Sequence, residues 1–565
     1  MCADMDQAVI FLLVLSLFLG NVTAALENTT TESVSDDAGI TVSLWNHSEN
    51  DAFKQRINLA PFNHLNITVT DIPSEIWFII LQIHTFQYNA TLCYDEALFD
   101  KVSNRSLFGS NIGLYLKTHN VTAPIQVFLK HDNVHNLDAL LVIVTYGRNA
   151  PTPGSCNMEF DIEVSPYQKL LAENDMIVVD TEPASILGPD GSPIPCEKSV
   201  QHKMYRLYLP RQDFTPDTYF DAIASMLTAQ DIARNGDEIP VGALTDSMRR
   251  VYSAYAGTGS VYAAVATYEN YSSAYVPIFT YACSPLLHPE SCQVLNDTFA
   301  GIVCALVLIT GCLSTIIGHK CAFIDGLLAS SMTGGVFGYI IATYTDDHRT
   351  IAIKILIGLA FAVLVTPAIS ILLSACKRIS GVLRNMSLGF LCACIAYLYA
   401  PAWMFYVLEH NWLFWPVFAI LTLAITTLLM PMSDAAEVIT RAIFGSYFVI
   451  VALDYYIGSN LKYIIVTIIR RMTIPGFHLA FVYPPLQSAD VTLLIIWSVL
   501  IIARFIIQQC ISSWCKGMPT IKIVMFNKDG VSLLANYRRS SIVAGSSKRS
   551  LMRLPKRDHV IRIHD

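Results

Sequence analysis

Two different hydrophobic patterns divide this chain of 565 residues. Up to about residue 297, apolar residues occur in short runs between polar and turn-forming residues, for example at 76–84, 124–129 and 139–146. Such runs are typical of β-strands. From residue 298 onwards, apolar stretches of about 20 residues follow one another. The pattern predicts a mixed fold, with a β-rich, sandwich-like ectodomain followed by an all-α bundle of seven transmembrane helices.

The seven predicted membrane spans cover residues 299–318, 322–344, 351–375, 386–408, 412–431, 438–458 and 491–508. Between the last two spans, residues 461–490 are too polar and too rich in proline to cross a bilayer. Within this segment, residues 462–472 predict an amphipathic helix that lies along the membrane interface. A re-entrant hairpin is the alternative for the same segment, because Pro484 and Pro485 follow.

The N-terminus carries signals for secretion. Residues 1–25 predict a signal peptide, because a short apolar run is followed by small residues. Asp4 and Asp6 stand where basic residues are usual, so an uncleaved anchor is the alternative. Acceptor motifs for N-glycosylation precede the first span at Asn28, Asn46, Asn66, Asn89, Asn104, Asn120, Asn270 and Asn296. Their position predicts a glycosylated, lumenal or extracellular N-terminal half.

Composition and charge support this topology. The chain is 53% hydrophobic and only 15% charged, whereas soluble domains carry about 25% charged residues. Acidic residues outnumber basic ones before residue 298, and the reverse holds after it. An acidic ectodomain argues against nucleic acid as a partner. Basic residues gather in alternate loops and in the tail, which predicts a cytoplasmic C-terminus.

Turn signals and composition predict six segments. They are a signal peptide (1–25), a flexible lead-in (26–56), a first β-rich module (57–190), a second β-rich module (191–297), a membrane domain (298–510) and a basic cytoplasmic tail (511–565). The boundary near 190 rests on the Pro- and Gly-rich stretch 188–195. Thr215 before Pro216 predicts the start of a helix over 216–234 in the second module.

The ectodomain contains five cysteines in an oxidising compartment, so disulfides are expected. Cys283 and Cys292 lie close in the sequence around a loop and are the first predicted pair. Cys156 with Cys196 is the second. Because five is an odd number, at least one cysteine stays free or bonds elsewhere.

Two features of the predicted bundle are candidates for function. Gly334 and Gly338 form a GxxxG pattern that lets helices approach closely, either within the bundle, in a homodimer or along a pore. Asp454 and Asp325 are ionisable residues within predicted spans, and such groups are costly to bury. For Asp454, a structural ion pair is favoured over an ion-binding role.

The chain lacks the motifs of the common enzyme classes, with no HExxH, GxSxG or P-loop. His131 and His135 are spaced as metal ligands on a helix would be, but their polar surroundings favour a solvated loop. No catalytic, cofactor-binding or metal-binding residue is predicted. A G-protein-coupled receptor is disfavoured, because the third span ends without a D/E-R-Y motif and the last has no N-P-x-x-Y.

Four segments resemble the transmembrane 7 superfamily member 3 family. They are 81–84, 153–160, 273–284 and 445–454 with its continuation to Phe477 and Gln487. The membrane region is also similar to the domain shared with the transmembrane protein 198 group. The resemblance implies a non-enzymatic, multi-pass glycoprotein of the plasma membrane and secretory pathway, linked to protection against cell death and to damping of the unfolded-protein response. It supplies no ligand and no cofactor.

Three functional hypotheses follow. The first is a stress-attenuating membrane protein whose ectodomain binds an unknown lumenal or extracellular protein or lipid while the bundle acts as a scaffold in the bilayer. The second is a channel or transporter that uses the small residues of the second span and Asp454. The third is an orphan receptor that couples through the basic tail, for which binding to anionic lipids is the simpler explanation.

Overall fold

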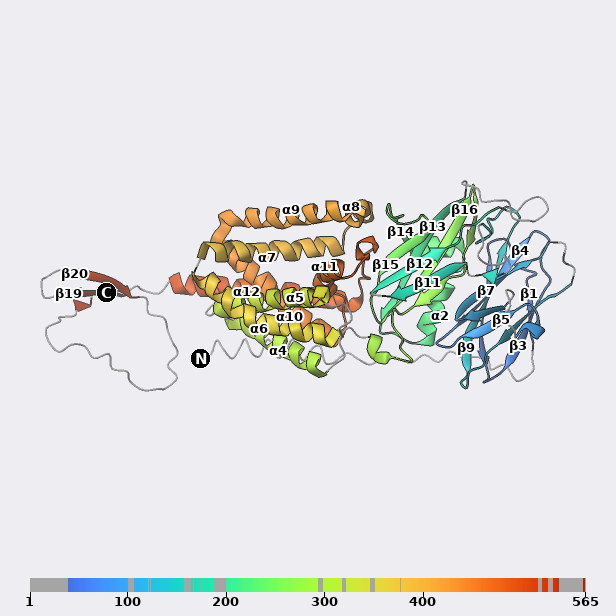
Figure 1. Ribbon diagram of the computed structural model, residues 1–565, viewed down its shortest axis with the longest axis horizontal. Helices are drawn as coiled ribbons and strands as arrows, with labels where there is room; N and C mark the ends of the chain where they lie inside the picture. The colour runs from blue at the N-terminus through green and yellow to red at the C-terminus, as the bar shows by residue number, and fades with distance from the viewer. Residues whose placement is uncertain are drawn as a thin grey trace.

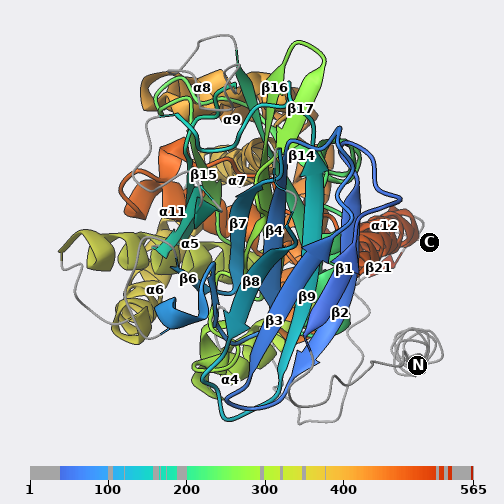
Figure 2. The same ribbon diagram turned by 90° about the vertical axis from the view of Figure 1, so that its right-hand side faces the viewer.

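The computed structural model describes residues 39–99, 106–119, 121, 123–156, 164–165, 167–173, 175–186, 200–292, 298–317, 322–345, 351–375, 377–516, 521–526, 532–537 and 562–563. Two β-domains and a helical bundle follow one another along the long axis of the molecule (Figure 1). Figure 2 looks along this row from the first β-domain. The predicted signal peptide lies outside the described residues.

The first β-domain is a sandwich of two five-stranded sheets. One sheet has the order β1 (Ile40–Ser43), β3 (His64–Thr70), β8 (Ile125–Lys130), β5 (Ala90–Cys93) and β6 (Ser106–Gly109), and a short 3-10 helix, η1 (Glu96–Leu98), follows β5. The other has the order β10 (Val164–Ser165), β7 (Asn111–Lys117), β4 (Phe78–Thr85), β9 (Leu137–Tyr146) and β2 (Ala52–Leu59). Alternate residues of β4 fill the space between the sheets, for example Ile79, Leu81 and Ile83.

The second β-domain also has two sheets. The smaller one joins β11 (Gln168–Glu173), β12 (Met176–Thr181) and β15 (Arg249–Ser253). The larger one has the order β14 (Asp237–Ile239), β13 (Gln201–Arg211), β16 (Thr258–Tyr268) and β17 (Tyr271–Ala274), and β18 (Ile278–Thr280) also pairs with β16. Strand β18 begins only after Pro277, which has no N–H to donate to the neighbouring strand.

The structure corrects two predicted boundaries of the ectodomain. Strands β11 and β12 precede residue 190, but β11 pairs with β12 and β12 pairs with β15, so both belong to the second domain. The Pro- and Gly-rich stretch therefore lies within that domain. Strand β1 and most of β2 fall in the predicted lead-in 26–56. Their polar side chains face outward from the sandwich and alternate with side chains that face inward. The average polarity of the segment hides this alternation, so a strand of this kind is mistaken for a polar linker.

The predicted helix over 216–234 is divided into α2 (Pro216–Ala224) and α3 (Ala229–Asn235). Thr228 takes an extended conformation between them, and its hydroxyl accepts a hydrogen bond from the Asp231 backbone N–H. This N-cap starts a second helix where the sequence pattern suggested one continuous helix.

The membrane half contains the long helices α4 (Thr298–Ile317), α5 (Ala322–Thr345), α6 (Ile351–Ala375), α7 (Lys377–Leu398), α9 (Asn411–Leu429), α10 (Ser433–Ile457) and α12 (Ser488–Lys516). Among the described residues, four segments are long and apolar enough to cross a membrane, namely 381–398, 411–429, 435–457 and 488–507. Shorter apolar stretches lie in α4 and α6, at 301–312 and 353–368. The arrangement of seven spans stays a prediction.

The fourth predicted span, 386–408, is shifted in the structure. Helix α7 ends at Leu398, and the chain is not helical at Ala400 and Pro401. Proline disfavours the helical conformation of the residue before it, which explains the break. The chain continues in the short helices η3 (Ala402–Met404) and α8 (Phe405–Glu409).

Smaller elements complete the described chain. They are η2 (Pro289–Cys292) before the bundle, η4 (Met430–Met432) after α9, and α11 (Tyr463–Thr473) with η5 (Phe477–Leu479) between α10 and α12. In the tail, β19 (Ile521–Phe526) pairs with β20 (Ser532–Tyr537) and with β21 (Arg562–Ile563).

Candidate functional site at the junction of the second domain and the helices

Helix α11 lies where the second β-domain meets the bundle (Figure 1). The predicted helix at 462–472 is therefore present, and Ile464, Ile465 and Ile468 are buried as its apolar pattern requires. Its polar residues Arg470 and Arg471 are buried as well. Because both its apolar and its charged residues are enclosed by protein, the helix connects two domains instead of presenting its polar face to solvent.

The two consecutive arginines of α11 bind opposite parts of the molecule. Adjacent residues of a helix point about 100° apart. Arg470 donates from Nη1 to the Ala254 carbonyl oxygen and from Nη2 to Asp175 Oδ1, both at 2.8 Å, and these acceptors belong to the second β-domain. Arg471 is directed towards the bundle, and its guanidinium lies 3.7 Å from the ring centre of Phe414.

Arg471 also connects three separate helical segments. Its guanidinium donates to the Tyr397 hydroxyl at 3.2 Å, to the Leu408 carbonyl oxygen at 2.6 Å and to Asn411 Oδ1 at 2.8 Å. These acceptors lie on α7, on α8 and at the start of α9. One buried arginine therefore holds the ends of these helices together next to α11.

A glutamine and an arginine form a second connection. Gln487 accepts a hydrogen bond from the Arg211 backbone N–H at 3.0 Å and donates to the Leu209 carbonyl oxygen at 3.0 Å. The Arg211 side chain donates to the carbonyl oxygen of Ser459, which follows α10. The last residues of β13 are thus held between the segments that follow α10 and precede α12.

A third connection extends a sheet. The Phe481 backbone N–H donates to the Val251 carbonyl oxygen at 2.8 Å, and the Ser253 N–H donates to the Phe481 carbonyl oxygen at 3.2 Å. Phe481 thereby forms a parallel bridge with Tyr252 at the edge of β15. A residue from the membrane half has joined the sheet of the ectodomain, which is the geometry of β-augmentation.

Glu409 forms the fourth connection. Its carboxylate, at the end of α8, is fully buried and accepts backbone hydrogen bonds from Ala243 at 2.6 Å and Leu244 at 2.8 Å. Trp403 and Trp412 lie nearby in the sequence and are strongly exposed. Exposed tryptophans are enriched at the boundary between membrane and water, which indicates that this junction lies near a membrane surface.

Asp454 lies beside Lys462 at the turn that follows α10. Its carboxylate accepts a hydrogen bond from the Lys462 backbone N–H at 3.0 Å and lies 3.7 Å from Lys462 Nζ. Burial lowers the pKa of the Lys462 ammonium to about 8, and the negative charge of Asp454 opposes this shift. The pair fixes the turn between α10 and α11. The side chain of Asp325 lies outside the described residues.

The small residues of α5 are covered within the chain. A side chain at Gly334 would approach the Ala362 backbone at 3.2 Å, and one at Gly338 would approach the Gly358 backbone at 3.1 Å and collide with Phe361. All three contacts lie on α6. The GxxxG face therefore packs α5 against α6, as the intramolecular interpretation of the pattern expects.

The ectodomain cysteines agree with the first predicted disulfide. Cys283 and Cys292 are bonded, with Cα atoms 5.0 Å apart. Cys156 is also disulfide-bonded, while its predicted partner Cys196 lies outside the described residues. Cys93 is free and buried, so it is a cysteine left over from pairing, as the odd number predicts.

The predicted glycosylation sites differ in exposure. Asn46, Asn89 and Asn270 are exposed, and Asn66 is half-buried on β3. The remaining four, Asn28, Asn104, Asn120 and Asn296, lie outside the described residues. His131 and His135 do not come together, because His131 is buried with Nε2 2.6 Å from the Ala60 carbonyl oxygen whereas His135 is exposed. Among the described residues, no cluster could hold a metal ion.

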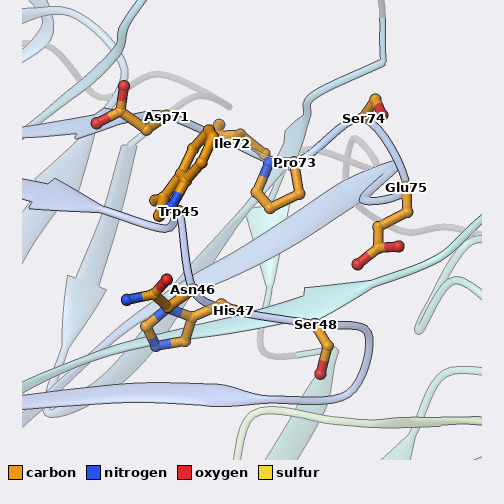
Figure 3. Close-up of a pocket in the computed structure, with 9 residues that line it drawn as sticks. All are labelled: Trp45, Asn46, His47, Ser48, Asp71, Ile72, Pro73, Ser74 and Glu75. Carbon is orange, nitrogen blue, oxygen red and sulfur yellow. The ribbon is translucent and has the colours of Figure 1, made fainter.

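A shallow groove of about 630 Å³ lies on the first β-domain, far from the junction (Figure 3). It is formed by the chain after β1 and the chain after β3, and it is lined by Trp45, Asn46, His47, Ser48, Asp71, Ile72, Pro73, Ser74 and Glu75. The Trp45 side chain is 77% exposed. An exposed indole beside two carboxylates and an amide offers both apolar contact and hydrogen bonds to a partner.

Sequence reasoning missed Glu409, Arg211 and Gln487 as functional candidates. A signal was present only for Arg470 and Arg471, where two adjacent charges interrupt an apolar helix. Glu409 directly follows the span 386–408, which was predicted too far along the chain, so its position at a domain junction was hidden. Arg211 and Gln487 are separated by 276 positions, and only the fold brings them together.

Comparison with known proteins gives three family matches in the same order as the domains. Residues 46–146 match the TM7SF3-like N-terminal immunoglobulin-like domain, residues 151–286 match the TM7SF3-like second immunoglobulin-like domain, and residues 304–509 match the TM7S3/TM198-like domain. Transmembrane 7 superfamily member 3 of Homo sapiens is 25% identical over 455 residues, which cover 78% of each chain. The protein of the same name from Mus musculus is 23% identical over 454 residues, covering 77% of this chain and 79% of its own.

Proposed function

Because this chain is a TM7SF3-like membrane protein with two immunoglobulin-like domains, we propose that it is a seven-pass glycoprotein that attenuates cellular and unfolded-protein stress. Its N-terminal half lies in the lumen or outside the cell, and its C-terminus lies in the cytoplasm. The resemblance to the family supports the stress role. The clustering of glycosylation motifs before the first span supports the topology and a route through the secretory pathway to the plasma membrane.

The protein acts by binding and transmission, without chemical conversion of a substrate. The observation that carries this proposal is the buried polar junction around α11. Arg470 holds the second β-domain and Arg471 holds α7, α8 and α9. A movement of the ectodomain relative to the membrane must therefore displace α11 or break its hydrogen bonds. Displacement of α11 in turn changes the ends of the helices that Arg471 connects.

The groove at Trp45 is the proposed binding surface for a lumenal or extracellular protein or lipid. It lies on the domain farthest from the bundle, where a large partner meets no obstruction from the membrane (Figure 1). Asn46 belongs to a glycosylation motif and lines the same groove. A glycan at Asn46 would therefore regulate access to Trp45.

The test is a rescue assay in cells that lack the protein, with a reporter of the unfolded-protein response read after a folding stress. Wild type is compared with Trp45→Ala and Arg470→Met at matched surface expression, and Phe62→Ala, another exposed aromatic of the first domain, is the control. We expect wild type and the control to lower the reporter and both test variants to lower it less. If wild type leaves the reporter unchanged, the stress role is wrong. If Trp45→Ala lowers the reporter as much as the wild type and only Arg470→Met does not, the groove is not the binding surface.

The channel or transporter hypothesis receives no specific support from its own residues. Asp454 is engaged by Lys462, and Gly334 and Gly338 are covered by α6. The receptor hypothesis depends on the tail, and so does the proposed binding of anionic lipids there. Deletion of residues 517–565 in the same assay tests whether the tail contributes.

A further inference from the structure

Two loops of the second β-domain expose pairs of apolar side chains. The first loop, residues 240–245, follows β14, and in it Val241 and Leu244 are exposed. The second lies within the disulfide between Cys283 and Cys292, and in it Leu286 and Leu287 are exposed, Leu287 to 76%. Single exposed apolar side chains are common on protein surfaces, whereas apolar side chains that gather at one place indicate a contact surface.

The 240–245 loop is held at the end of a membrane span. Glu409 of α8 accepts hydrogen bonds from the backbone N–H groups of Ala243 and Leu244. Two residues after Glu409, α9 begins at Asn411, and residues 411–429 are long and apolar enough to cross a membrane. Exposed tryptophans precede and follow Glu409 in the sequence, as at a boundary between lipid and water. The loop therefore lies where α9 leaves the membrane.

The disulfide loop is held at the end of a second span. The Cys292 carbonyl oxygen lies against Gly257, where an added side chain would approach it at 2.6 Å. The Gly257 carbonyl oxygen accepts a hydrogen bond from the Gln212 backbone N–H at 2.7 Å. The Gln212 side chain in turn lies 3.6 Å from the position that a side chain at Gly458 would occupy. Gly458 directly follows the apolar segment 435–457 of α10.

Both loops have uncharged tips. The His288 backbone N–H donates to the Ser284 carbonyl oxygen at 2.9 Å, which closes a tight turn with Leu286 and Leu287 at its tip. Neither residues 284–287 nor residues 240–245 include an acidic or basic side chain, although the ectodomain as a whole is acidic. Such tips can enter the lipid headgroup region without the cost of removing a charge from water.

The two loops stand on opposite sides of the junction. Helix α8, which holds the 240–245 loop, and α4, which follows the disulfide loop, lie at opposite edges of the bundle in both views (Figure 1, Figure 2). A bilayer that surrounds the bundle therefore meets the second β-domain at two separated places.

We propose that the 240–245 loop and the disulfide loop insert their apolar tips into the lipid leaflet nearest the ectodomain. The partner is the boundary between headgroups and acyl chains, where valine and leucine side chains lose contact with water. Because the tips carry no charge, neutral lipids such as phosphatidylcholine are sufficient. This inference goes beyond the proposed function, because it gives the ectodomain a membrane contact of its own.

The two contacts restrict how the ectodomain moves. If the second β-domain tilts over the membrane, one of the loops is pulled out of the lipid and its apolar side chains are exposed to water. The bilayer therefore opposes the same movement that would break the hydrogen bonds of Arg470 and Glu409. Lipid packing around the bundle thereby affects the junction at α11.

The test uses the full-length protein in phosphatidylcholine nanodiscs, with a fluorescent amino acid in place of Leu287, Val241 or Val134 in separate samples. Val134 lies on the first β-domain and is the matched control, since it is 65% exposed and Val241 is 56% exposed. Lipids with bromine atoms near the start of their acyl chains quench a fluorophore that reaches them. We expect a loss of fluorescence at positions 287 and 241 and none at 134. Quenching at neither loop, or at only one of them, overturns the proposal.

A second measurement needs no variant. Hydroxyl radicals oxidise side chains that water reaches, and mass spectrometry locates the oxidised residues. In wild-type protein in nanodiscs, Val241 should be oxidised much less than Val134, although the two valines are similarly exposed in the protein without lipid. Leu287 should be protected in the same way. Equal oxidation of Val241 and Val134 would show that the loop remains in water and would refute the membrane contact.

Discussion

The second β-domain contacts its two neighbours through interfaces that differ in how much they depend on buried polar side chains. Towards the first β-domain, it shares one hydrophobic core. Phe78, Val144 and Tyr146 of the first domain pack in the same cluster as Phe220 and Ile223 of α2. Towards the bundle, Tyr252 also packs with Phe405 and Phe481. Buried charged and polar side chains add many of the specific contacts there, as Arg470, Glu409 and Gln487 show.

The difference teaches which parts of the molecule move together. An apolar core is dense and non-directional, and its separation would expose a large apolar surface to water. The two β-domains therefore behave as one rigid ectodomain. Interfaces between domains that rely on polar contacts resemble transient protein interfaces, and movement across them is the default expectation. Ligand-dependent changes should therefore concentrate at the junction around α11.

The largest expected effect comes from the apolar interface. Phe220→Ala removes a buried ring that packs between the two β-domains. Deletion of a buried aromatic side chain destabilises a protein by about 3–5 kcal/mol. Thermal unfolding of the full-length protein and limited proteolysis of the ectodomain should both report this loss.

Phe108→Ala provides the control for that variant, because Phe108 is strongly exposed on β6. It should change the melting temperature little. If Phe220→Ala also has little effect, the two β-domains do not depend on a common core, and the contrast between the interfaces fails.

The next effect concerns acid. A polar chain crosses the apolar interface, in which His84 Nδ1 lies 2.9 Å from Asn111 Oδ1 and the Tyr219 hydroxyl donates to the same oxygen at 3.0 Å. Burial lowers the pKa of His84 from 6.5 to about 4. Between these values the unfolded chain binds a proton that the folded chain does not. Stability therefore falls as the pH drops from 6.5 towards 4, by roughly 3 kcal/mol for a shift of this size.

The check is the unfolding midpoint of the full-length protein measured from pH 7.5 to pH 4.5. His84→Gln should show a flatter decline than the wild type. Burial also lowers the pKa of His202 to about 4, so His202→Gln should flatten the curve as well. Only His84→Gln alters the interface between the domains. If the unfolding midpoint of His84→Gln falls with pH as steeply as that of the wild type, another group causes the acid sensitivity.

At the polar junction, Glu409→Ala is expected to have a smaller and more local effect. It removes the acceptor for two backbone N–H groups, and hydrogen bonds to a charged group contribute about 1.5–3 kcal/mol each. Water can enter the loosened edge and recover part of this loss. Hydrogen exchange in detergent should speed up around Ala243 and Leu244 while the first β-domain stays protected. Equal acceleration of hydrogen exchange in both β-domains would contradict the expectation that the junction loosens independently of the first β-domain.

The sequence predicted the architecture well where its signal is local. Alternating apolar residues indicated β4 and β9, and long apolar stretches indicated α9 and α10 with their ends nearly right. The break at Pro401 was missed, because an apolar window continues through it into the residues of α8. The boundary predicted near residue 190 was wrong because the Pro- and Gly-rich stretch 188–195, which separates β12 from β13 in the sequence, has the composition of a linker between domains.

The junction could not be predicted, because its contacts join residues far apart in the chain. Arg470 and Asp175 are 295 positions apart, and no periodicity relates them. The sequence did identify Asp454 as a candidate for a structural ion pair, since a carboxylate near the end of a span needs a partner. It could not identify Lys462 as that partner without the turn between α10 and α11.

The smallest expected difference compares two arginine–aspartate pairs of the second domain. Arg249 and Asp180 form a pair on the exposed face of the small sheet, where both side chains remain largely accessible. Such pairs contribute about 0–1 kcal/mol because water and salt screen them. Arg470 pairs with Asp175 from a buried position and also donates to Ala254. Arg249→Met should therefore leave the melting temperature nearly unchanged, while Arg470→Met should lower it measurably and make the linkage between ectodomain and bundle more sensitive to protease. Equal effects of the two variants would mean that burial does not strengthen the junction, and that the polar interface is held by Glu409 and Gln487 instead.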